Sequence, residues 1–280
     1  MLQIISTSLI ILSALSLVSC STPNTSPCRS DTYDKDLQVN DESAAMANAT
    51  ILASGQSLPL LPGEYTIVCF GDSTTAPREG FVVYAENLRR MLPAYEINAG
   101  VINTGVGGEN TSEALIRFCK SVLNHNPHLV IIQFGINDAA VDIWKSPPAT
   151  GPQVSLQTFT DNMTYFVQTL KKEGASVILM TANAMTWTEE LLSLFGNTPY
   201  LPEEKWGFNV MLSGYNQAVR DIARKENVTL IDVFRMCTEY DSVKGQNIND
   251  LLSDGMHPNS KGHHLISDKL IRHIAGAPAP

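Results

Sequence analysis

The order of apolar and amphipathic segments predicts an α/β fold, with a parallel sheet of about five strands and helices on both faces. Two observations support this fold class. Short apolar runs, each typical of a buried parallel strand, recur along the chain from Tyr65 onward. Between them lie stretches with apolar residues at helical spacing, and such an alternation implies a doubly wound sheet. A chain of 280 residues, 44% of them hydrophobic, is long enough to bury a core of this kind.

The individual elements follow from the same periodicity. The first strand is expected at residues 66–70, an apolar run that leads into Gly71. The later strands are expected at residues 97–103, 129–134, 176–181 and 228–231. Helices are expected at residues 84–91, 112–123, 159–173, 212–225 and 261–274, the third of them stopped by Gly174. The polar, proline-bearing and aromatic segments 144–152 and 188–207 are predicted to be loops over one end of the sheet.

The first twenty residues are typical of an export signal. Residues 9–18 are almost wholly apolar or small, a run too short to span a bilayer but suited to the core of a signal peptide. The run ends in Leu17-Val18-Ser19-Cys20, which resembles the bacterial lipobox, although residues 1–3 carry no Lys or Arg. We therefore expect a signal peptide over residues 1–20, lipidation of Cys20 and anchoring at the cell envelope, with ordinary secretion as the alternative. Residues 21–61 are interpreted as a tether and lead-in, and residues 62–280 as one folded domain.

Charge and cysteine content exclude some classes of partner. The net charge of −9 argues against a broad nucleic-acid footprint, which needs clustered Lys and Arg. The cysteines other than Cys20 fit neither a compact disulfide framework nor a C-x-x-C zinc pattern, so we predict no metal site and leave disulfide pairing open. Cys69 falls within the first predicted strand and is expected to be a buried, unreactive thiol.

Two segments could supply a nucleophile and its base. Gly71-Asp72-Ser73 directly follows the first strand, and ligands in open α/β sheets bind beyond the carboxyl ends of the strands. The alternative is that Asp72 or Ser73 caps the following helix. Near the other end of the chain, Asp254 precedes His257 by three residues, so that both side chains can converge in one turn. A serine needs a base to take its proton, and the imidazole needs an acceptor that fixes its tautomer.

Two further segments offer hydrogen-bond donors for an oxyanion. Residues 103–108 follow the second strand, and their glycines allow the backbone to present N–H groups. The alternatives are a tight turn or a phosphate loop, but the dinucleotide spacing G-x-G-x-x-G is broken by Asn110. Residues 135–138 follow the third strand and include the amide of Asn137, with an ordinary turn or helix cap as the alternative.

In this order, the four segments resemble the motifs of the SGNH (GDSL) hydrolase family. The matching positions are Gly71-Asp72-Ser73 for block I, Gly108 for block II, Gly135-x-Asn137-Asp138 for block III and Asp254-x-x-His257 for block V. The resemblance spans about residues 65–275, and the G-x-S-x-G elbow of ordinary α/β-hydrolases is absent. It implies a three-layer α/β/α, flavodoxin-like sandwich over residues 62–280. It also implies a triad of Ser73, His257 and Asp254, and an oxyanion hole formed by the N–H groups of Ser73 and Gly108 and the side chain of Asn137. Gly107 replaces Gly108 if the loop is shifted by one residue.

The family resemblance implies hydrolysis of an ester through an acyl-enzyme on Ser73, without any cofactor. Among the family's substrates, an exported acidic enzyme without an obvious long apolar channel best fits O-acetyl groups on a polysaccharide or a smaller carbohydrate. Trp144, Trp187 and Trp206 lie in the predicted loops, where they would stack on sugar rings or simply pack a lid. The alternatives are a short-chain lipase or lysophospholipase, and a catalytically silent glycan-binding surface lipoprotein.

Overall fold

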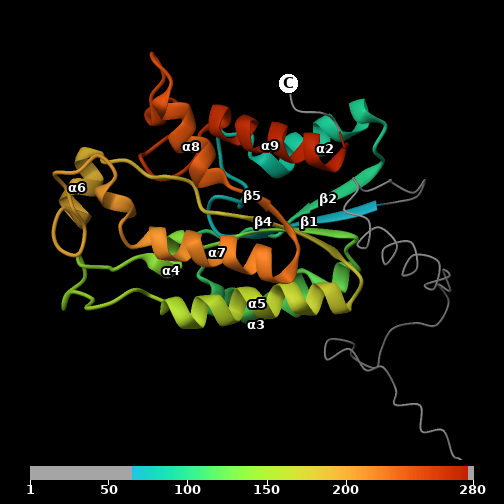
Figure 1. Ribbon diagram of the computed structural model, residues 1–280, viewed down its shortest axis with the longest axis horizontal. Coiled ribbons are helices and arrows are strands. Elements are labelled where there is room, and N and C mark those ends of the chain that lie inside the picture. Colours follow the sequence, from blue (N-terminus) through green and yellow to red (C-terminus); the bar gives the residue numbers. More distant parts are fainter. Residues whose placement is uncertain (1–64, 277–280) are drawn as a thin grey trace, which may run out of the picture.

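The computed structural model describes residues 65–276, in which one parallel sheet is covered by helices on both sides (Figure 1). The predicted signal peptide, Cys20 and the tether of residues 21–61 lie outside the described residues. Among residues 65–276, no helix is long and apolar enough to cross a membrane.

The sheet contains five strands in the order β2-β1-β3-β4-β5, all parallel. The strands are β1 (Tyr65–Gly71), β2 (Ala99–Asn103), β3 (Leu129–Gln133), β4 (Ser176–Met180) and β5 (Thr229–Ile231). The sequence placed all five correctly, apart from the start of β2. There, a 3-10 turn ends at Glu96 in a left-handed conformation, with φ 59°, which delays the strand to Ala99. From β1, the chain first adds β2 on one side of the sheet and then adds β3, β4 and β5 on the other side. In sheets of this kind, ligands bind in the crevice at the carboxyl ends of the two strands where the order reverses, here β1 and β3.

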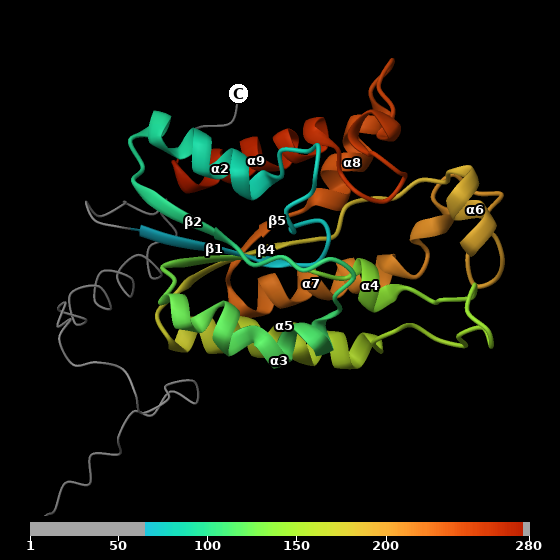
Figure 2. The same ribbon diagram turned by 180° about the vertical axis from the view of Figure 1, so that it is seen from behind.

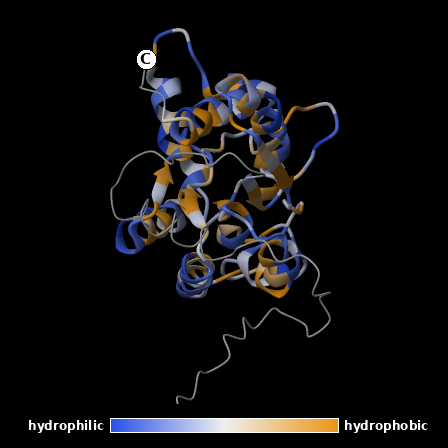
Figure 3. Ribbon diagram, turned by 90° about the vertical axis from the view of Figure 1, so that its right-hand side faces the viewer, coloured by the Kyte–Doolittle hydropathy of each residue, from blue (hydrophilic) through white to orange (hydrophobic). Residues whose placement is uncertain are grey.

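The two faces of the sheet carry separate hydrophobic cores, because successive side chains of a strand point to opposite faces. Val68 and Phe70 face the core that α3, α5 and α7 cover, whereas Ile67 and Cys69 face the core under α2, α8 and α9. Figure 2 shows the two helical layers from behind, and Figure 3 shows the apolar residues gathered on the strands and the inner helix faces. The predicted three-layer arrangement is confirmed.

Five helices match the sequence predictions closely. They are α2 (Tyr84–Met91), α3 (Thr111–Ser121), α5 (Leu156–Lys172), α7 (Leu212–Glu226) and α9 (Ser260–Ile274). Gly174 follows the end of α5 with φ 82°, a conformation that suits glycine after a helix. The sequence did not indicate α4 (Ile136–Ala139) or α8 (Val233–Ser242), nor the 3-10 turns Leu92–Tyr95, Leu123–His125, Gly207–Asn209 and Ile248–Leu251.

The prediction of a loop over residues 188–207 was wrong in part, because this segment contains α6 (Glu189–Phe195). Thr188 caps the helix by accepting a hydrogen bond from the backbone N–H of Leu191, and two glutamates in the first turn favour the positive end of the helix dipole. Leu191 and Phe195, four residues apart, then bury one face. The helix lies beyond the carboxyl ends of the strands, at the left of Figure 1.

The described cysteines fall into two groups. Cys69 and Cys237 are free and buried, and burial raises the pKa of each thiol, to about 12 and about 11. Cys69 is therefore the buried, unreactive thiol that the sequence predicts. Cys119 is disulfide-bonded, which the cysteine spacing did not indicate.

Candidate active site

Ser73 lies in a tight turn directly after β1. Asp72 organises this turn: its carboxylate Oδ1 accepts hydrogen bonds from the backbone N–H and the hydroxyl of Thr74, both at 2.8 Å, and its carbonyl accepts from the N–H groups of Thr75 and Ala76. Burial raises the pKa of Asp72 to about 7. Neither Asp72 nor Ser73 caps an α-helix, because α2 begins only at Tyr84, with Val83 at its N-cap. The capping alternative is therefore wrong.

The structure brings Ser73, His257 and Asp254 into one hydrogen-bonded line. The Ser73 hydroxyl lies 2.9 Å from Nε2 of His257, although 184 positions separate the two residues in the chain. On the other side of the imidazole, Nδ1 lies 2.8 Å from Oδ2 of Asp254. A hydroxyl, a ring nitrogen and a carboxylate in this order allow the hydroxyl proton to pass to the imidazole while the carboxylate holds the ring tautomer.

The turn that carries Asp254 and His257 is stabilised from within. Oδ1 of Asp254 accepts hydrogen bonds from the backbone N–H groups of Met256, at 3.1 Å, and His257, at 2.8 Å. Gly255 between them has φ 83°, and a Cβ at this position would lie 2.8 Å from the carbonyl oxygen of Thr186. Glycine is therefore required here both for its backbone conformation and for the close approach of the neighbouring chain.

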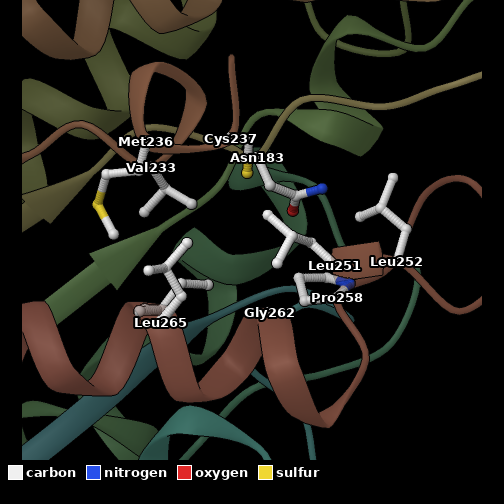
Figure 4. A pocket seen from close by; sticks show the side chains of 10 residues that line it. Asn183, Val233, Met236, Cys237, Leu251, Leu252, Pro258, Gly262 and Leu265 are labelled. Carbon is white, nitrogen blue, oxygen red and sulfur yellow. The ribbon is translucent and has the colours of Figure 1, made fainter. Parts of the chain in front are cut away.

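The segment after β4 supports this turn from below. The backbone N–H of Thr186 donates to the carbonyl of Gly255 at 2.8 Å, and the amide of Asn183 donates to the carbonyl of Met256 at 2.8 Å. Asn183 also borders a cavity of about 10 Å³ between this segment, α8 and the start of α9 (Figure 4). A space of this volume is about the size of one water molecule, so the support under the turn is well packed.

The two loops that the sequence predicts to supply oxyanion donors meet next to this site. The amide nitrogen of Asn137 donates one of its two hydrogens to the carbonyl of Glu109, at 3.0 Å, and the other remains available. Gly108 has φ 76°, and it lines the same cavity as Asn137, whereas Gly107 does not line this cavity. Of the two glycines that the sequence left open, Gly108 is thus the one that borders the cavity.

Two charged residues that the motifs did not indicate hold the Gly108 loop. Arg117 of α3 forms an ion pair with the buried carboxylate of Glu109, and its guanidinium lies over the Phe70 ring, 4.9 Å from the centroid. Because Asn137 binds the carbonyl of the same Glu109, the ion pair fixes both donor-bearing loops to β1. Arg117 lies eight positions after Glu109, which precedes the start of α3. This spacing does not by itself predict that the two side chains make contact.

Asp138 links two helices and caps neither, since Gly135 is the N-cap of α4 and Asn110 the N-cap of α3. Its Oδ1 accepts hydrogen bonds from the backbone N–H and the hydroxyl of Thr111, at 2.9 and 2.5 Å, at the start of α3. Burial raises the pKa of Asp138 to about 6. This contact joins α4 to α3 and so contributes to the placement of Asn137.

A cavity of about 320 Å³ opens beside the oxyanion loops. Most of its wall is apolar and comes from α4, α6 and the segments that follow β4, with Met256 bringing it up to the His257 turn. The polar wall is Gly108, Asn137, Asp142 and Gln153, and the apolar wall includes Ile136, Trp144, Met185, Leu194, Phe195, Tyr200, Phe208, Met211, Leu212 and Met256. Within residues 65–276, no group of three or more His, Cys, Asp or Glu side chains is arranged to hold a metal ion.

The electrostatic setting of His257 predicts how activity depends on pH. Burial lowers the pKa of His257 below the 6.5 of a free imidazole, and the charge of Arg78 lowers it further, although Asp254 acts in the opposite direction. As the base that the sequence predicts, His257 must be neutral, so kcat/KM is expected to rise with pH through an apparent pKa below 6.5 and to be level at neutral pH. Initial rates on a neutral ester between pH 4.5 and 8 measure this profile. An acid limb centred above pH 7 would assign the base to another group.

The match to a protein-family model identifies the family of this chain. The model of the GDSL-like lipase/acylhydrolase family matches residues 69–265, from the end of β1 to α9. The chain belongs to the GDSL-like lipase/acylhydrolase family. It is therefore an ester hydrolase of the SGNH type, as its motifs predicted.

Relatives of this acylhydrolase include one curated protein and several solved structures. The uncharacterized lipoprotein YqeF of Bacillus subtilis (strain 168) is 30% identical over 216 residues, which are 73% of this chain and 87% of the relative. A lipase/acylhydrolase from Enterococcus faecalis is 25% identical, with a TM-score of 0.58, over 77% of this chain and 98% of that one. An acetylxylan esterase from Geobacillus stearothermophilus shares the fold at 22% identity, with a TM-score of 0.60, over 76% and 95% of the two chains.

Proposed function

We propose that this acylhydrolase is a serine esterase that removes acyl groups, acetyl above all, from carbohydrate through an acyl-enzyme on Ser73. The observation that carries this proposal is the hydrogen-bonded line of Ser73, His257 and Asp254. It lies next to a cavity whose wall includes Gly108 and Asn137, the proposed oxyanion donors.

In the proposed reaction, His257 Nε2 takes the proton of the Ser73 hydroxyl as the oxygen attacks the ester carbonyl. Asp254 accepts the hydrogen bond from Nδ1 and stabilises the imidazolium that forms. The N–H groups of Ser73 and Gly108 and the amide of Asn137 hold the oxyanion, and each such donor is typically worth about 2.7–4 kcal/mol. The imidazolium then protonates the departing alcohol. Water, activated by the same imidazole, releases the acid and restores Ser73.

The three tryptophans differ in their suitability for binding sugar. Trp187 stacks on Phe208, with the ring centroids 4.8 Å apart, and Trp206 packs against the core under α8 and α9. Trp144 instead lines the cavity and is 51% exposed, with the ammonium of Lys145 over its ring, 5.4 Å from the centroid. Close to it, Asp142 is bound by Gln153 at 3.1 Å and by Lys145 at 2.7 Å. A half-exposed aromatic ring beside fixed polar groups suits a sugar ring, which has apolar faces and polar edges.

The names of the structural neighbours point to the same substrate class. Two of the proteins that share the fold are acetylxylan esterases, one of them from Geobacillus stearothermophilus. The most direct test supplies the purified enzyme with acetylated xylo-oligosaccharides and with p-nitrophenyl esters of two to twelve carbons. Acetate release from the oligosaccharides and a preference for the two-carbon ester are expected.

The mostly apolar wall of the cavity favours a second candidate, a short-chain lipase or lysophospholipase. In that case, kcat/KM would increase with acyl length along the p-nitrophenyl series, because each added methylene buries more apolar surface. Such a trend, together with no acetate release from acetylated oligosaccharides, would replace the carbohydrate substrate with a lipid-like ester.

Removing the Trp144 ring tests the carbohydrate substrate more specifically. We expect Trp144→Ala to lower kcat/KM on acetylated xylo-oligosaccharides by about two- to twelvefold, mainly through KM, since an aromatic face contributes about 0.5–1.5 kcal/mol. Turnover of p-nitrophenyl acetate should stay close to wild type, because this ester presents no sugar. Tyr165→Ala, at a ring of similar exposure on α5, is the matched control. Equal losses on both substrates would argue against a sugar subsite at Trp144.

We also propose that the enzyme is held at the cell envelope by a lipid on Cys20, as the lipobox-like Leu17-Val18-Ser19-Cys20 predicts. The name of the Bacillus subtilis relative, a lipoprotein, supports this location. Partition of the protein from whole cells into a Triton X-114 detergent phase distinguishes a lipid anchor from ordinary secretion, since the lipid draws an acylated protein into that phase, whereas a secreted chain stays in the aqueous phase.

A further inference from the structure

Arg78, which no family motif includes, contacts the proposed triad from the nucleophile side. Its Nη2 donates a hydrogen bond to Oδ2 of Asp254 at 2.8 Å. Oδ2 is the same oxygen that lies 2.8 Å from Nδ1 of His257. The other oxygen, Oδ1, already accepts two backbone N–H groups. Arg78 and the imidazole therefore share one oxygen, and the carboxylate of Asp254 is held at four points.

The remaining contacts of Arg78 include no second carboxylate in the described part of the chain. The guanidinium lies over the ring of Phe81, 5.8 Å from the centroid, which restricts its orientation. Its Nη1 is buried without an acceptor in the described part of the chain. Among residues 65–276, Asp254 is also the one carboxylate that pairs with it. The ion pair is about one-third exposed on both sides, so its value lies in orientation and local potential rather than in global stability.

We propose that Arg78 is a positioning residue of the active site, which shares Oδ2 of Asp254 with His257, fixes the carboxylate and offsets part of its charge. This inference rests on the proposed function, since it assigns to His257 the role of base. A carboxylate that faces the imidazole alone would favour the protonated ring strongly. A guanidinium on the same oxygen weakens that preference, so that His257 stays neutral and ready to accept a proton in mildly acidic surroundings.

The charges around His257 are consistent with this role. Although burial of Asp254 acts in the opposite direction, the backbone N–H and the charge of His257, together with Arg78, hold the pKa of this carboxyl well below its usual range. From α9, His263 is the other titratable group that faces His257, and burial first, then the charges of Arg78 and His257, lower its pKa to about 4. The segment after β4 contributes the neutral Asn183 and Thr186. Near pH 6, the charged neighbours of His257 are thus Asp254 and Arg78.

The pH dependence of activity in Arg78→Met distinguishes a positioning residue from a residue that only links two loops. The substitution removes the charge and keeps much of the side-chain length. We expect the acid limb of kcat/KM on p-nitrophenyl acetate to move to higher pH, and kcat to fall roughly tenfold or more as the carboxylate loses its orientation. KM should change little. Arg78→Lys, which restores the charge, should return the acid limb towards wild type, and Arg224→Met, at an exposed arginine of α7, is the control.

A second measurement does not depend on ester turnover. The pKa of the His257 ring, followed by NMR titration in wild type and in Arg78→Met, is expected to rise in the variant. An unchanged His257 titration and acid limb, with only a lower Tm, would overturn the proposal and leave Arg78 as a structural link between two loops. If wild type cleaves no ester, but the pKa of His257 still rises from wild type to Arg78→Met, the proposed function is wrong and the role of Arg78 stands. If Arg78→Met does not fold, Arg78→Gln and Arg78→Lys permit the same comparison.

Discussion

Ser73→Ala is expected to lower kcat on p-nitrophenyl acetate by about 10⁴-fold or more, with little change in Tm. Without the hydroxyl, no acyl-enzyme can form, and only binding and the oxyanion donors remain to assist direct attack by water. The fold should be retained, because the turn at Ser73 is held by Asp72, Thr74 and the backbone rather than by the Ser73 hydroxyl. The measurement is kcat for the purified variant and wild type under one set of conditions, with circular dichroism of both.

Labelling by a fluorophosphonate probe complements the kinetic result. Wild type should react covalently at Ser73, and boiled protein or Ser73→Ala should not react. Ser242→Ala, which removes a hydroxyl from the end of α8, is the control and should label normally. Native protein that remains unlabelled would favour the catalytically silent, glycan-binding alternative.

Asp254→Asn is expected to lower kcat by about 10⁴-fold, by imposing the wrong tautomer on His257. Two backbone N–H groups point at the Oδ1 position and one N–H of Arg78 at Oδ2, so the oxygen of an asparagine side chain is expected at Oδ1, where it keeps two hydrogen bonds. The amide NH₂ group then faces Nδ1 of His257, which has to become an acceptor. Nε2 consequently carries the proton and can no longer take one from Ser73.

The loss in Asp254→Asn should persist at every pH, which distinguishes a tautomer effect from a shifted titration. Asp268→Asn is a matched control, because Asp268 is also paired with an arginine and has the same side-chain exposure, 37%. Activity of Asp254→Asn within tenfold of wild type would show that another group orients His257.

The sequence was sufficient for the sheet and for the residues of the four motifs. Buried parallel strands produce apolar runs that are recognised locally, and the motif residues lie directly after those strands or before a helix. The spacing of Asp254 and His257 is likewise local. What brought Ser73 to them is the packing of α2 against α9, which follows from the fold class rather than from any short pattern.

The parts that the sequence did not reveal depend on contacts between distant segments. Arg78 and Asp254 are 176 positions apart, and neither carries a local signal for the other. The cavity is formed by α4, α6 and the segments after β4, so its size depends on how they pack. The start of α6 did have a signal, Thr188 followed by two glutamates, but it was concealed by the surrounding proline and aromatic residues.

The placement of the proposed nucleophile and base at opposite ends of the domain affects when the enzyme becomes active. A chain folded only as far as β5 would hold Ser73 and Asn137, yet it would lack the proposed base, because His257 arrives with the turn before α9. The last helix must dock on α2 before Ser73 can react. With this triad, nascent or partly unfolded molecules are expected to be catalytically silent, so that ester turnover would report that folding has been completed.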